Sequence, residues 1–211
     1  MNTIGIVALA GASLWAVAWV WRRFMRFLDR QQGADWGRPW LNRLDGLNRW
    51  LCRRFHRLES EPLKLPSRGG VIVVANHISG LDPLLMIAAS PRPLRFIIAR
   101  EQYERWYLRW LFRAVGCIPI GRRGGHRRAL DAAIEALRRG EAVALFPEGG
   151  IRLGRGTPQL KPGVALLAQE TGAPICVLRL DGISARGKTL AAVFWRSRAR
   201  ISQRGLIRRR H

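Results

Sequence analysis

The alternation of short apolar runs with helical segments from residue 71 onward constrains the fold of this chain more than any other sequence feature. The apolar runs are residues 71–75, 95–99, 117–120, 142–146 and 175–180. The helical segments between them are residues 82–89, 129–137 and 164–170. Strands that alternate with helices are typical of a sheet covered by helices. We therefore expect an α/β domain with a mostly parallel, mixed sheet flanked by helices.

The length and charge of the chain narrow the class of partner. A chain of 211 residues is long enough to bury a core within one domain. The formal charge of +23 favours an anionic partner, which can be nucleic acid, a phospholipid surface or an acidic protein. Nine tryptophans beside many arginines are typical of a membrane interface. The membrane is therefore the preferred partner, and no nucleic acid is expected.

The amino-terminal segment is the candidate membrane anchor. Residues 4–21 contain no charged side chain, which is close to the lower limit of about 17 residues for a spanning helix. Arginines follow at once, so the positive-inside rule places the remainder of the chain in the cytoplasm. A helix that only dips into the bilayer is the alternative. Either way, we predict an anchor with a basic flank over residues 1–30 and location at the inner (cytoplasmic) membrane.

A second segment with amphipathic character precedes the predicted domain. Between residues 40 and 58 apolar side chains recur at helical spacing, with arginines at many of the remaining positions. This helix can lie on anionic headgroups, with Trp40 and Trp50 at the boundary, or pack on its own domain. Residues 101–112 have the same aromatic and basic texture and leave the same choice open. We assign residues 31–66 to this helix and a linker, and residues 67–211 to the folded domain.

Cysteine and histidine spacing indicates neither disulfides nor a metal site. Cys52, Cys117 and Cys176 are odd in number and far apart, without a C-x-x-C pair. The four histidines are isolated, without the spacing of metal ligands. We expect reduced thiols and no metal.

The segment NHISGLD, residues 76–82, carries the clearest chemical signal. His77 lies on a loop between a predicted strand and a predicted helix, and Asp82 followed by Pro83 marks the helix start. An Asp there can accept the ring N–H of His77 and leave the other ring nitrogen as a base. The alternative is that Asp82 only caps the helix and His77 is an ordinary loop residue.

Three further blocks accompany this motif in order along the chain: GCIPIGR at 116–122, FPEGG at 146–150 and KPG at 161–163. Together the four blocks resemble those of the glycerolipid acyltransferases, typified by bacterial 1-acylglycerol-3-phosphate acyltransferase. The resemblance covers about residues 65–180. It implies that His77 deprotonates the acceptor hydroxyl, that Asp82 orients His77, and that the hydroxyl attacks a thioester directly. It also implies that Arg122 binds the phosphate of the acceptor.

The FPEGG block both matches and departs from the family pattern. Glu148 and Gly149 match the family's acceptor-binding turn. Where the family has FPEGTR, this chain has Gly150 in place of Thr and its arginine one position later, at Arg152. We assign Arg152 to phosphate binding on the resemblance alone. Val177 stands where the family usually has proline. These departures leave room for a different acceptor.

The resemblance implies transfer of a fatty acyl group from acyl-CoA or acyl carrier protein to a lysophospholipid hydroxyl. The expected acceptor is 1-acyl-sn-glycerol-3-phosphate, giving phosphatidic acid, and another lysolipid such as a lyso-aminolipid is the alternative. The expected partners are membrane phospholipids and the acyl donor, without a bound cofactor.

Two other classes of function remain as alternatives. A hydrolase that uses Ser79 lacks the G-x-S-x-G elbow expected of such enzymes. A basic module that binds membrane or nucleic acid without catalysis lacks the known nucleic-acid-binding signatures.

Overall fold

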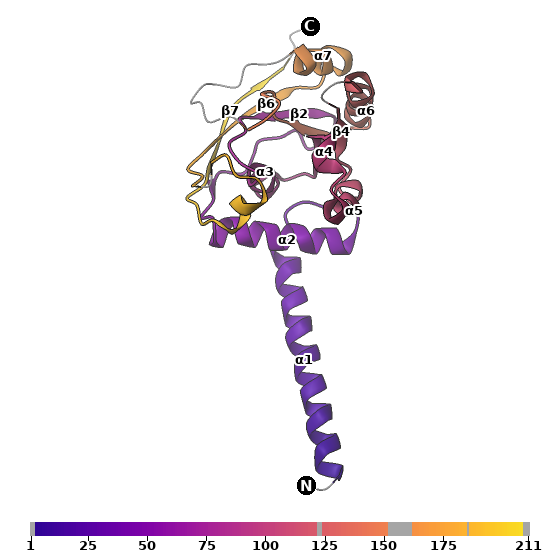
Figure 1. Cartoon of the computed structure of the whole chain (residues 1–211), viewed down its shortest axis with the longest axis vertical. Coiled ribbons are helices and arrows are strands. Elements are labelled where there is room, and N and C mark those ends of the chain that lie inside the picture. The colour runs from indigo at the N-terminus through magenta and orange to yellow at the C-terminus, as the bar shows by residue number, and fades with distance from the viewer. Residues whose placement is uncertain (1–2, 122–123, 152–161, 185, 209–211) are drawn as a thin grey trace.

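The computed structural model of the chain describes residues 3–121, 124–151, 162–184 and 186–208, and leaves the side chains of residues 3–10 and 190 undescribed. The elements in chain order are α1 (Thr3–Gln31), α2 (Pro39–Arg54), β1 (Glu59–Ser60), β2 (Val71–Ala75), α3 (Asp82–Ala89), β3 (Leu94–Ala99), α4 (Arg100–Tyr103), α5 (Trp106–Ala114), β4 (Ile118–Ile120), α6 (His126–Arg138), β5 (Ala142–Leu145), α7 (Pro162–Thr171), β6 (Ile175–Asp181), the 3-10 helix η1 (Leu190–Phe194) and β7 (Arg200–Ile207). A slender helical stem, α1, carries a rounded α/β domain (Figure 1).

The strands form one mixed sheet in the order β1-β7-β6-β2-β5-β3-β4. Every neighbouring pair is parallel except β6 and β7, which run antiparallel. The expected mostly parallel sheet is therefore confirmed. In the described part of the connection between β6 and β7 there is a 3-10 helix and no α-helix, whereas parallel strands are usually joined through an α-helix. The β7 strand, the short β1 and η1 had no counterpart in the sequence-based prediction.

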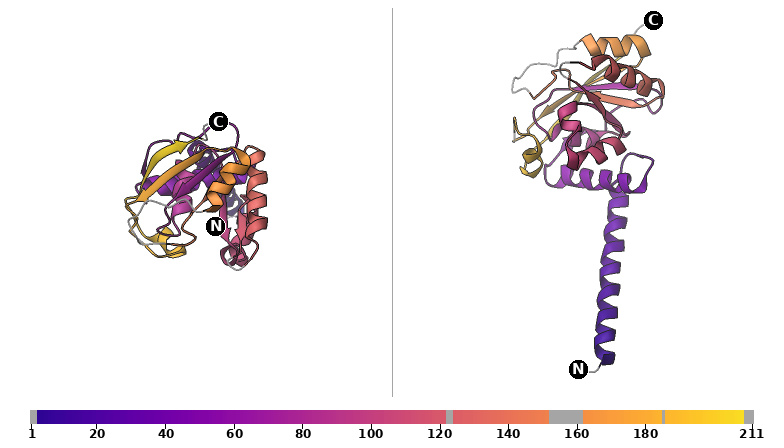
Figure 2. Two further views of the ribbon diagram at one scale, coloured as in Figure 1. Left: turned by 90° about the horizontal axis from the view of Figure 1, so that it is seen from above. Right: turned by 45° about the vertical axis from the view of Figure 1, so that its right-hand side comes forward.

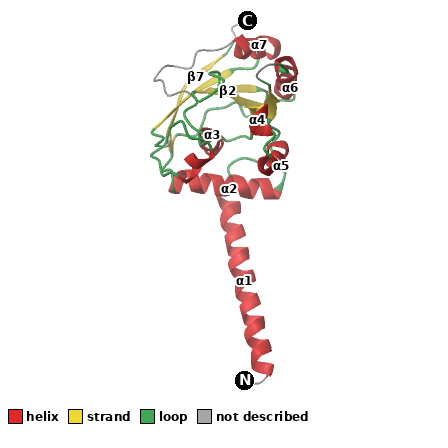
Figure 3. Ribbon diagram, in the orientation of Figure 1, coloured by secondary structure: helices red, strands yellow, loops and turns green. Residues whose placement is uncertain are grey.

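Alternate residues of β2 build two separate cores. All five residues of this strand are buried. Val71 and Val73 face a cluster that includes Leu85 of α3, whereas Ile72 and Val74 face a cluster supplied largely by α6 and α7. This alternation follows from the two-residue repeat of a strand. Helices thus cover both faces, with α6 and α7 on one side and α3 on the other (Figure 3).

Helix α2 lies across the base of the domain, where it crosses the end of α1. At the crossing, a Cβ on Gly46 would collide with the carbonyl oxygen of Leu28. Only glycine permits so close an approach of two helix backbones. The right-hand view of Figure 2 shows that α1 projects away from the domain beyond this crossing.

The buried face of α2 contains an ion pair, and its exposed face contains large apolar side chains. Asp45 and Arg49 are buried and form an ion pair, with Asp45 Oδ2 at 2.7 Å from Arg49 Nε. Arg49 also donates to the carbonyl oxygens of Ala88 (2.9 Å) and Ser90 (2.6 Å) at the end of α3. The exposed stripe, which we call the α2 stripe, consists of Trp40, Leu44, Leu47 and Trp50. The helix therefore packs on its own domain through this ion pair and the buried Leu41 and Cys52, and leaves four large apolar side chains outside.

The predicted span at residues 4–21 lies partly among the undescribed side chains. In the described part of α1, the uncharged residues 11–21 lead directly to Arg22. Across the side chains that the structure describes, no helix combines the length and the apolar character needed to cross a membrane.

Residues 101–112 do not form one amphipathic helix as the texture of the sequence suggested. The chain turns at residues 104 and 105, between α4 and α5. Helix α5 buries none of its residues fully and leaves Trp106 and Trp110 exposed. The ring of Trp110 lies 5.8 Å from that of Trp40, so α5 extends the apolar surface of α2.

Candidate active site

The chain leaves the central strand β2 at Asn76, which is fixed to the neighbouring strand. Its side-chain amide donates to the carbonyl oxygen of Leu180 (2.9 Å) and its carbonyl oxygen accepts from the N–H of the same residue (2.8 Å). Asn76 thus continues the pairing of β2 with β6 beyond the end of the strand. The following residue, His77, leaves the sheet at a fixed position at its carboxyl edge. Ligands of open α/β sheets bind at such edges.

The structure brings His77 and Asp82 together, with Nδ1 of the ring 2.8 Å from Oδ2 of the carboxylate. Asp82 is fully buried, and the side chain of His77 is 18% exposed. The same Oδ2 accepts hydrogen bonds from the N–H groups of Ile78 (2.6 Å) and Ser79 (2.9 Å). The carboxylate therefore turns back onto its own loop and fixes both the loop and the ring. When Nδ1 donates to Asp82, the neutral imidazole keeps Nε2 unprotonated and able to accept a proton.

Ser79 holds Asp82 from the opposite side. Its hydroxyl donates to Oδ1 of Asp82 (3.0 Å) and accepts from the N–H of Leu81 (3.1 Å). Because Ser79 is fully buried and bonded to the carboxylate, it lacks the exposed, histidine-paired hydroxyl that a hydrolase nucleophile needs. This geometry argues against the hydrolase alternative.

Aromatic stacking fixes the plane of the His77 ring. The ring lies 4.1 Å from that of Phe146, centroid to centroid, at an interplanar angle of 13°. Phe146 in turn stacks on Phe96 at 6.1 Å. The sequence analysis assigned no role to either phenylalanine. A signal for Phe146 was available, since it opens the FPEG block and directly follows a predicted strand.

Glu148 and Gly149 lie at the same edge of the sheet. They follow β5, which pairs in parallel with β2, and the N–H of Gly149 donates to the carbonyl oxygen of Phe146 (3.1 Å) to close a turn. Glu148 is half-buried. The structure therefore places Glu148 in the turn after β5, beside the strand β2 that leads into the His77 loop. Arg122 and Arg152, the two predicted phosphate ligands, lie outside the described residues.

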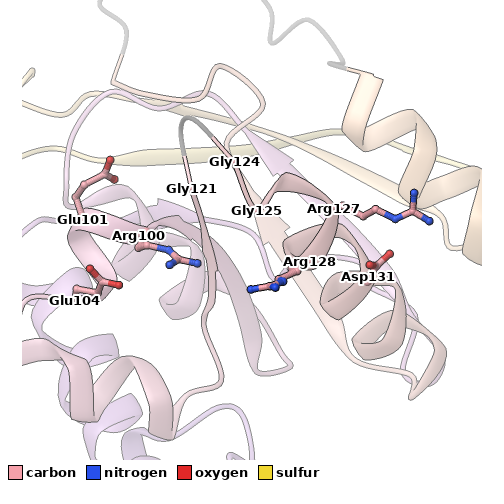
Figure 4. A pocket seen from close by; sticks show the side chains of 9 residues that line it. All are labelled: Arg100, Glu101, Glu104, Gly121, Gly124, Gly125, Arg127, Arg128 and Asp131. Carbon is pink, nitrogen blue, oxygen red and sulfur yellow. The ribbon is translucent and has the colours of Figure 1, made fainter.

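A pocket of about 990 Å³ opens at the ends of the next two strands. It is lined by Arg100, Glu101, Glu104, Gly121, Gly124, Gly125, Arg127, Arg128 and Asp131. Arg100 follows β3 and Gly121 follows β4. The side chains of Arg100 and Arg128 extend toward each other across the pocket (Figure 4).

The amino end of α6 also borders this pocket. No side chain caps this helix end, and its first turn contains no acidic residue. Unpaired N–H groups and the helix dipole favour an anion there. The lining combines three arginines with the carboxylates of Glu101, Glu104 and Asp131. The arginines and the helix end are the groups in it that can bind an anion.

Burial keeps the three thiols protonated. It raises the pKa of Cys52 and Cys117 to about 12 and that of Cys176 to about 11. All three are free cysteines. Across the described ranges, no group of three His, Cys, Asp or Glu side chains is placed to hold a metal ion.

Comparisons with known proteins point to one family. The model of the acyltransferase family, described as "Acyltransferase", matches residues 56–180. A probable 1-acyl-sn-glycerol-3-phosphate acyltransferase from Mycoplasma pneumoniae is 33% identical over 128 residues, which are 57% of this chain and 47% of the relative. The 1-acyl-sn-glycerol-3-phosphate acyltransferase of Neisseria gonorrhoeae is 32% identical over 127 residues, 58% of this chain and 48% of its own length. The chain thus spans about half the length of these curated relatives.

A solved structure shares the fold. The crystal structure of the 1-acyl-sn-glycerophosphate (LPA) acyltransferase PlsC from Thermotoga maritima matches with a TM-score of 0.61 and 20% sequence identity. The match covers 90% of this chain and 78% of that chain. At this level of identity the likeness establishes the architecture.

Proposed function

The chain belongs to the acyltransferase family, and from this membership we propose that it transfers a fatty acyl group to 1-acyl-sn-glycerol-3-phosphate. The product is phosphatidic acid, and the donor is the thioester of coenzyme A or of acyl carrier protein. The names of the relatives support this acceptor. The observation that carries the proposal is the contact of His77 Nδ1 with the buried carboxylate of Asp82.

His77 is the general base of this reaction. Its Nε2 takes the proton of the acceptor hydroxyl as the oxygen attacks the thioester carbonyl carbon. The resulting tetrahedral intermediate collapses, the carbon–sulfur bond breaks, and the proton on His77 passes to the departing thiolate. The acyl group is then on the acceptor oxygen and the proton on the released thiol. No covalent acyl-enzyme forms.

Asp82 and Phe146 position the base. Three hydrogen bonds at Oδ2 hold the carboxylate still, and the stacked Phe146 ring prevents the imidazole from tilting. A base held in one orientation reacts without a search among rotamers. Glu148, in the turn after the neighbouring strand β5, is proposed to hold glycerol oxygens of the acceptor.

The pocket between Arg100 and Arg128 is proposed to receive the acceptor's phosphate. Arg100 and Arg128 face each other across it, and the uncapped start of α6 adds N–H donors. Guanidinium groups bind phosphate oxygens in pairs and stay charged at every relevant pH. Arg122 and Arg152 keep their sequence-based roles in phosphate binding as proposals.

We place the domain at the cytoplasmic face of the inner membrane. The α2 stripe exposes two tryptophans and two leucines on the side of the domain from which α1 departs. An exposed apolar surface surrounded by arginines suits the headgroup region of an anionic membrane.

The test is acyl transfer by the purified full-length chain from radiolabelled acyl-CoA and acyl carrier protein to a panel of lysolipids. We expect transfer to 1-acyl-sn-glycerol-3-phosphate, and a rise in its KM without an equal fall in kcat for the Arg100→Ala/Arg128→Ala variant. Transfer only to another lysolipid, such as a lyso-aminolipid, would show that the proposed acceptor is wrong and that the proposed reaction type is right. The absence of transfer from either donor to every acceptor would refute the proposal.

A further inference from the structure

The connection between β6 and β7 exposes two large aromatic side chains at its tip. We call its described residues 186–198 the β6–β7 arm. Phe194 is 82% exposed and Trp195 is 57% exposed. The solvent-facing position of both rings is unfavourable in water, because each ring leaves a large apolar area unburied.

The residues on either side of Phe194 and Trp195 are buried and hydrogen-bonded. Ala192 and Ser197, on either side of the tip, are buried. The N–H of Ala192 donates to the carbonyl oxygen of Thr189 (3.1 Å), and the N–H of Ser184 donates to the hydroxyl of Ser197 (3.1 Å). The backbone therefore presents Phe194 and Trp195 outward as a fixed feature.

One cation lies over the Trp195 ring, and others are close to both rings in the sequence. Lys188 places Nζ 4.8 Å from the centre of the Trp195 ring. The arm contains Arg186, Arg196 and Arg198 as further exposed cations, and no acidic residue follows Asp181 in the sequence. Aromatic rings among Lys and Arg side chains match the interface of an anionic bilayer, where rings enter the headgroup layer and cations meet phosphates.

The arm lies at the same end of the domain as α2. The N–H of Ala199, just past the arm, donates to the carbonyl oxygen of His56, just past α2 (3.0 Å). In Figures 1 and 2, η1 lies beside one end of α2, and α1 leaves the domain from this side. The arm and the α2 stripe can therefore meet one surface at the same time.

The arm is also bonded to the loop that carries His77. The N–H of Gly187 donates to the carbonyl oxygen of Ile78 (2.9 Å), and the N–H of Gly80 donates to the carbonyl oxygen of Lys188 (2.9 Å). At Gly80 a Cβ would lie 2.6 Å from the carbonyl oxygen of Thr189, so this close approach requires glycine. The first residues of the arm and the His77 loop thus form one hydrogen-bonded unit.

We propose that Phe194 and Trp195 insert into the headgroup layer of an anionic phospholipid bilayer, as a lipid contact separate from α1 and α2. Through the hydrogen bonds of residues 187 and 188 to the His77 loop, this contact holds the loop at the height where a lipid acceptor presents its hydroxyl. The insertion is inferred from the residues of the arm alone, whereas its effect on acyl transfer rests on the proposed function.

The insertion is tested with a local probe, because α1 and α2 can hold the full chain on vesicles without the arm. Phe194→Cys carries an environment-sensitive fluorophore, and Leu166→Cys, exposed on α7 at the opposite end of the domain, is the control. Burial and raised pKa values make the native thiols poor competitors for the label.

With vesicles of phosphatidylglycerol and phosphatidylethanolamine we expect a blue shift at position 194 and none at position 166. The shift should weaken in purely zwitterionic vesicles and at high salt. An unchanged spectrum at position 194 in protein that has bound the vesicles would overturn the insertion.

The link to acyl transfer is tested with Phe194→Ser/Trp195→Ser, with Leu166→Ser as the matched control. We expect transfer to a long-chain acceptor embedded in vesicles to fall about tenfold, and transfer to a water-soluble short-chain acceptor to stay unchanged. An equal loss with both acceptors would contradict the proposed link and assign the arm a purely structural role. A wild-type chain without transfer to any acceptor would refute the proposed function, and the fluorescence result would still decide the insertion.

Discussion

Two buried aspartates in this molecule have nearly the same surroundings and different partners. Oδ2 of Asp45 accepts from the N–H groups of Gly33 (2.9 Å) and Ala34 (3.4 Å) and from Arg49. Oδ2 of Asp82 accepts from the N–H groups of Ile78 and Ser79 and contacts His77. Each Oδ2 is thus held by two backbone donors and one basic side chain, and only Asp82 has a further donor, the Ser79 hydroxyl, at Oδ1.

The partner decides what each carboxylate can do. Arg49 is buried and donates from its remaining nitrogens to the carbonyl oxygens of Ala88 and Ser90. It can only hold α2 against α3. His77 is partly exposed, can gain or lose a proton, and has one ring nitrogen directed away from its carboxylate. Similar hydrogen bonds thus hold one carboxylate in a structural ion pair and the other beside a histidine that we propose transfers a proton.

Asp82→Asn gives the largest expected effect. The amide can donate to Nδ1 of His77, which favours the tautomer with its proton on Nε2 and removes the base. We expect kcat for acyl transfer to fall about 10³-fold. The matched control is Asp45→Asn, which should lower stability and leave kcat per folded molecule unchanged. A similar kcat loss in both variants would break the comparison.

Arg49→Met is the corresponding change at the static site. It leaves Asp45 buried without its cation, so the free energy of unfolding should fall by about 3 kcal/mol. Denaturant unfolding of the full-length chain measures this, with Arg43→Met as control, because the Arg43–Asp29 pair is largely exposed. The double variant Asp45→Asn/Arg49→Met should recover part of the loss, and no recovery would show that the two charges do not act as a pair.

Phe146→Leu sharpens the account of His77. Leucine keeps an apolar contact but loses the flat face against which the imidazole stacks. We expect kcat to fall about tenfold, with little change in the KM of the acceptor, because only the orientation of the base is affected. Steady-state kinetics decide this, and Phe96→Leu, one ring further from His77, should have a smaller effect. A change confined to KM would place Phe146 in acceptor binding instead.

His56 gives the smallest effect and a test of pH dependence. Burial lowers the pKa of this histidine, and the backbone of Val193 comes near the ring without full hydrogen-bond geometry at either ring nitrogen. Below pH about 6.5, His56 binds a proton in the unfolded chain but not in the folded chain. The free energy of unfolding therefore falls as the pH falls from that value.

His56 alone changes the free energy of unfolding by at most about 1.4 kcal/mol per pH unit. Unfolding midpoints measured between pH 7.5 and pH 5.5 should show this change. The same series on His56→Phe should be flatter by that amount. An identical slope in the two proteins would show that His56 titrates normally.

The sequence predicted those features that depend on neighbouring residues. The strand Val71–Ala75, the helix start at Asp82 and the juxtaposition of His77 with Asp82 all arise within a dozen residues. The parallel sheet followed from the alternation of elements.

Features that depend on distant pairing were not predictable in this way. Phe146 reaches His77 only because β5 pairs with β2. The periodicity of α2 indicated two faces. Which face is buried depends on the hydrogen bonds of Arg49 to the carbonyl oxygens of Ala88 and Ser90, at the end of another helix. An exposed apolar stripe over a buried ion pair reverses the usual pattern, so no local rule anticipates it.

The most direct test of the central claim compares wild type with His77→Ala in acyl transfer from a radiolabelled thioester to 1-acyl-sn-glycerol-3-phosphate. Circular dichroism and the unfolding midpoint serve to confirm that both chains are folded. The account predicts that kcat falls about 10⁴-fold in the variant, because the acceptor hydroxyl loses its base. Transfer by a folded His77→Ala chain at a rate close to wild type would contradict the account.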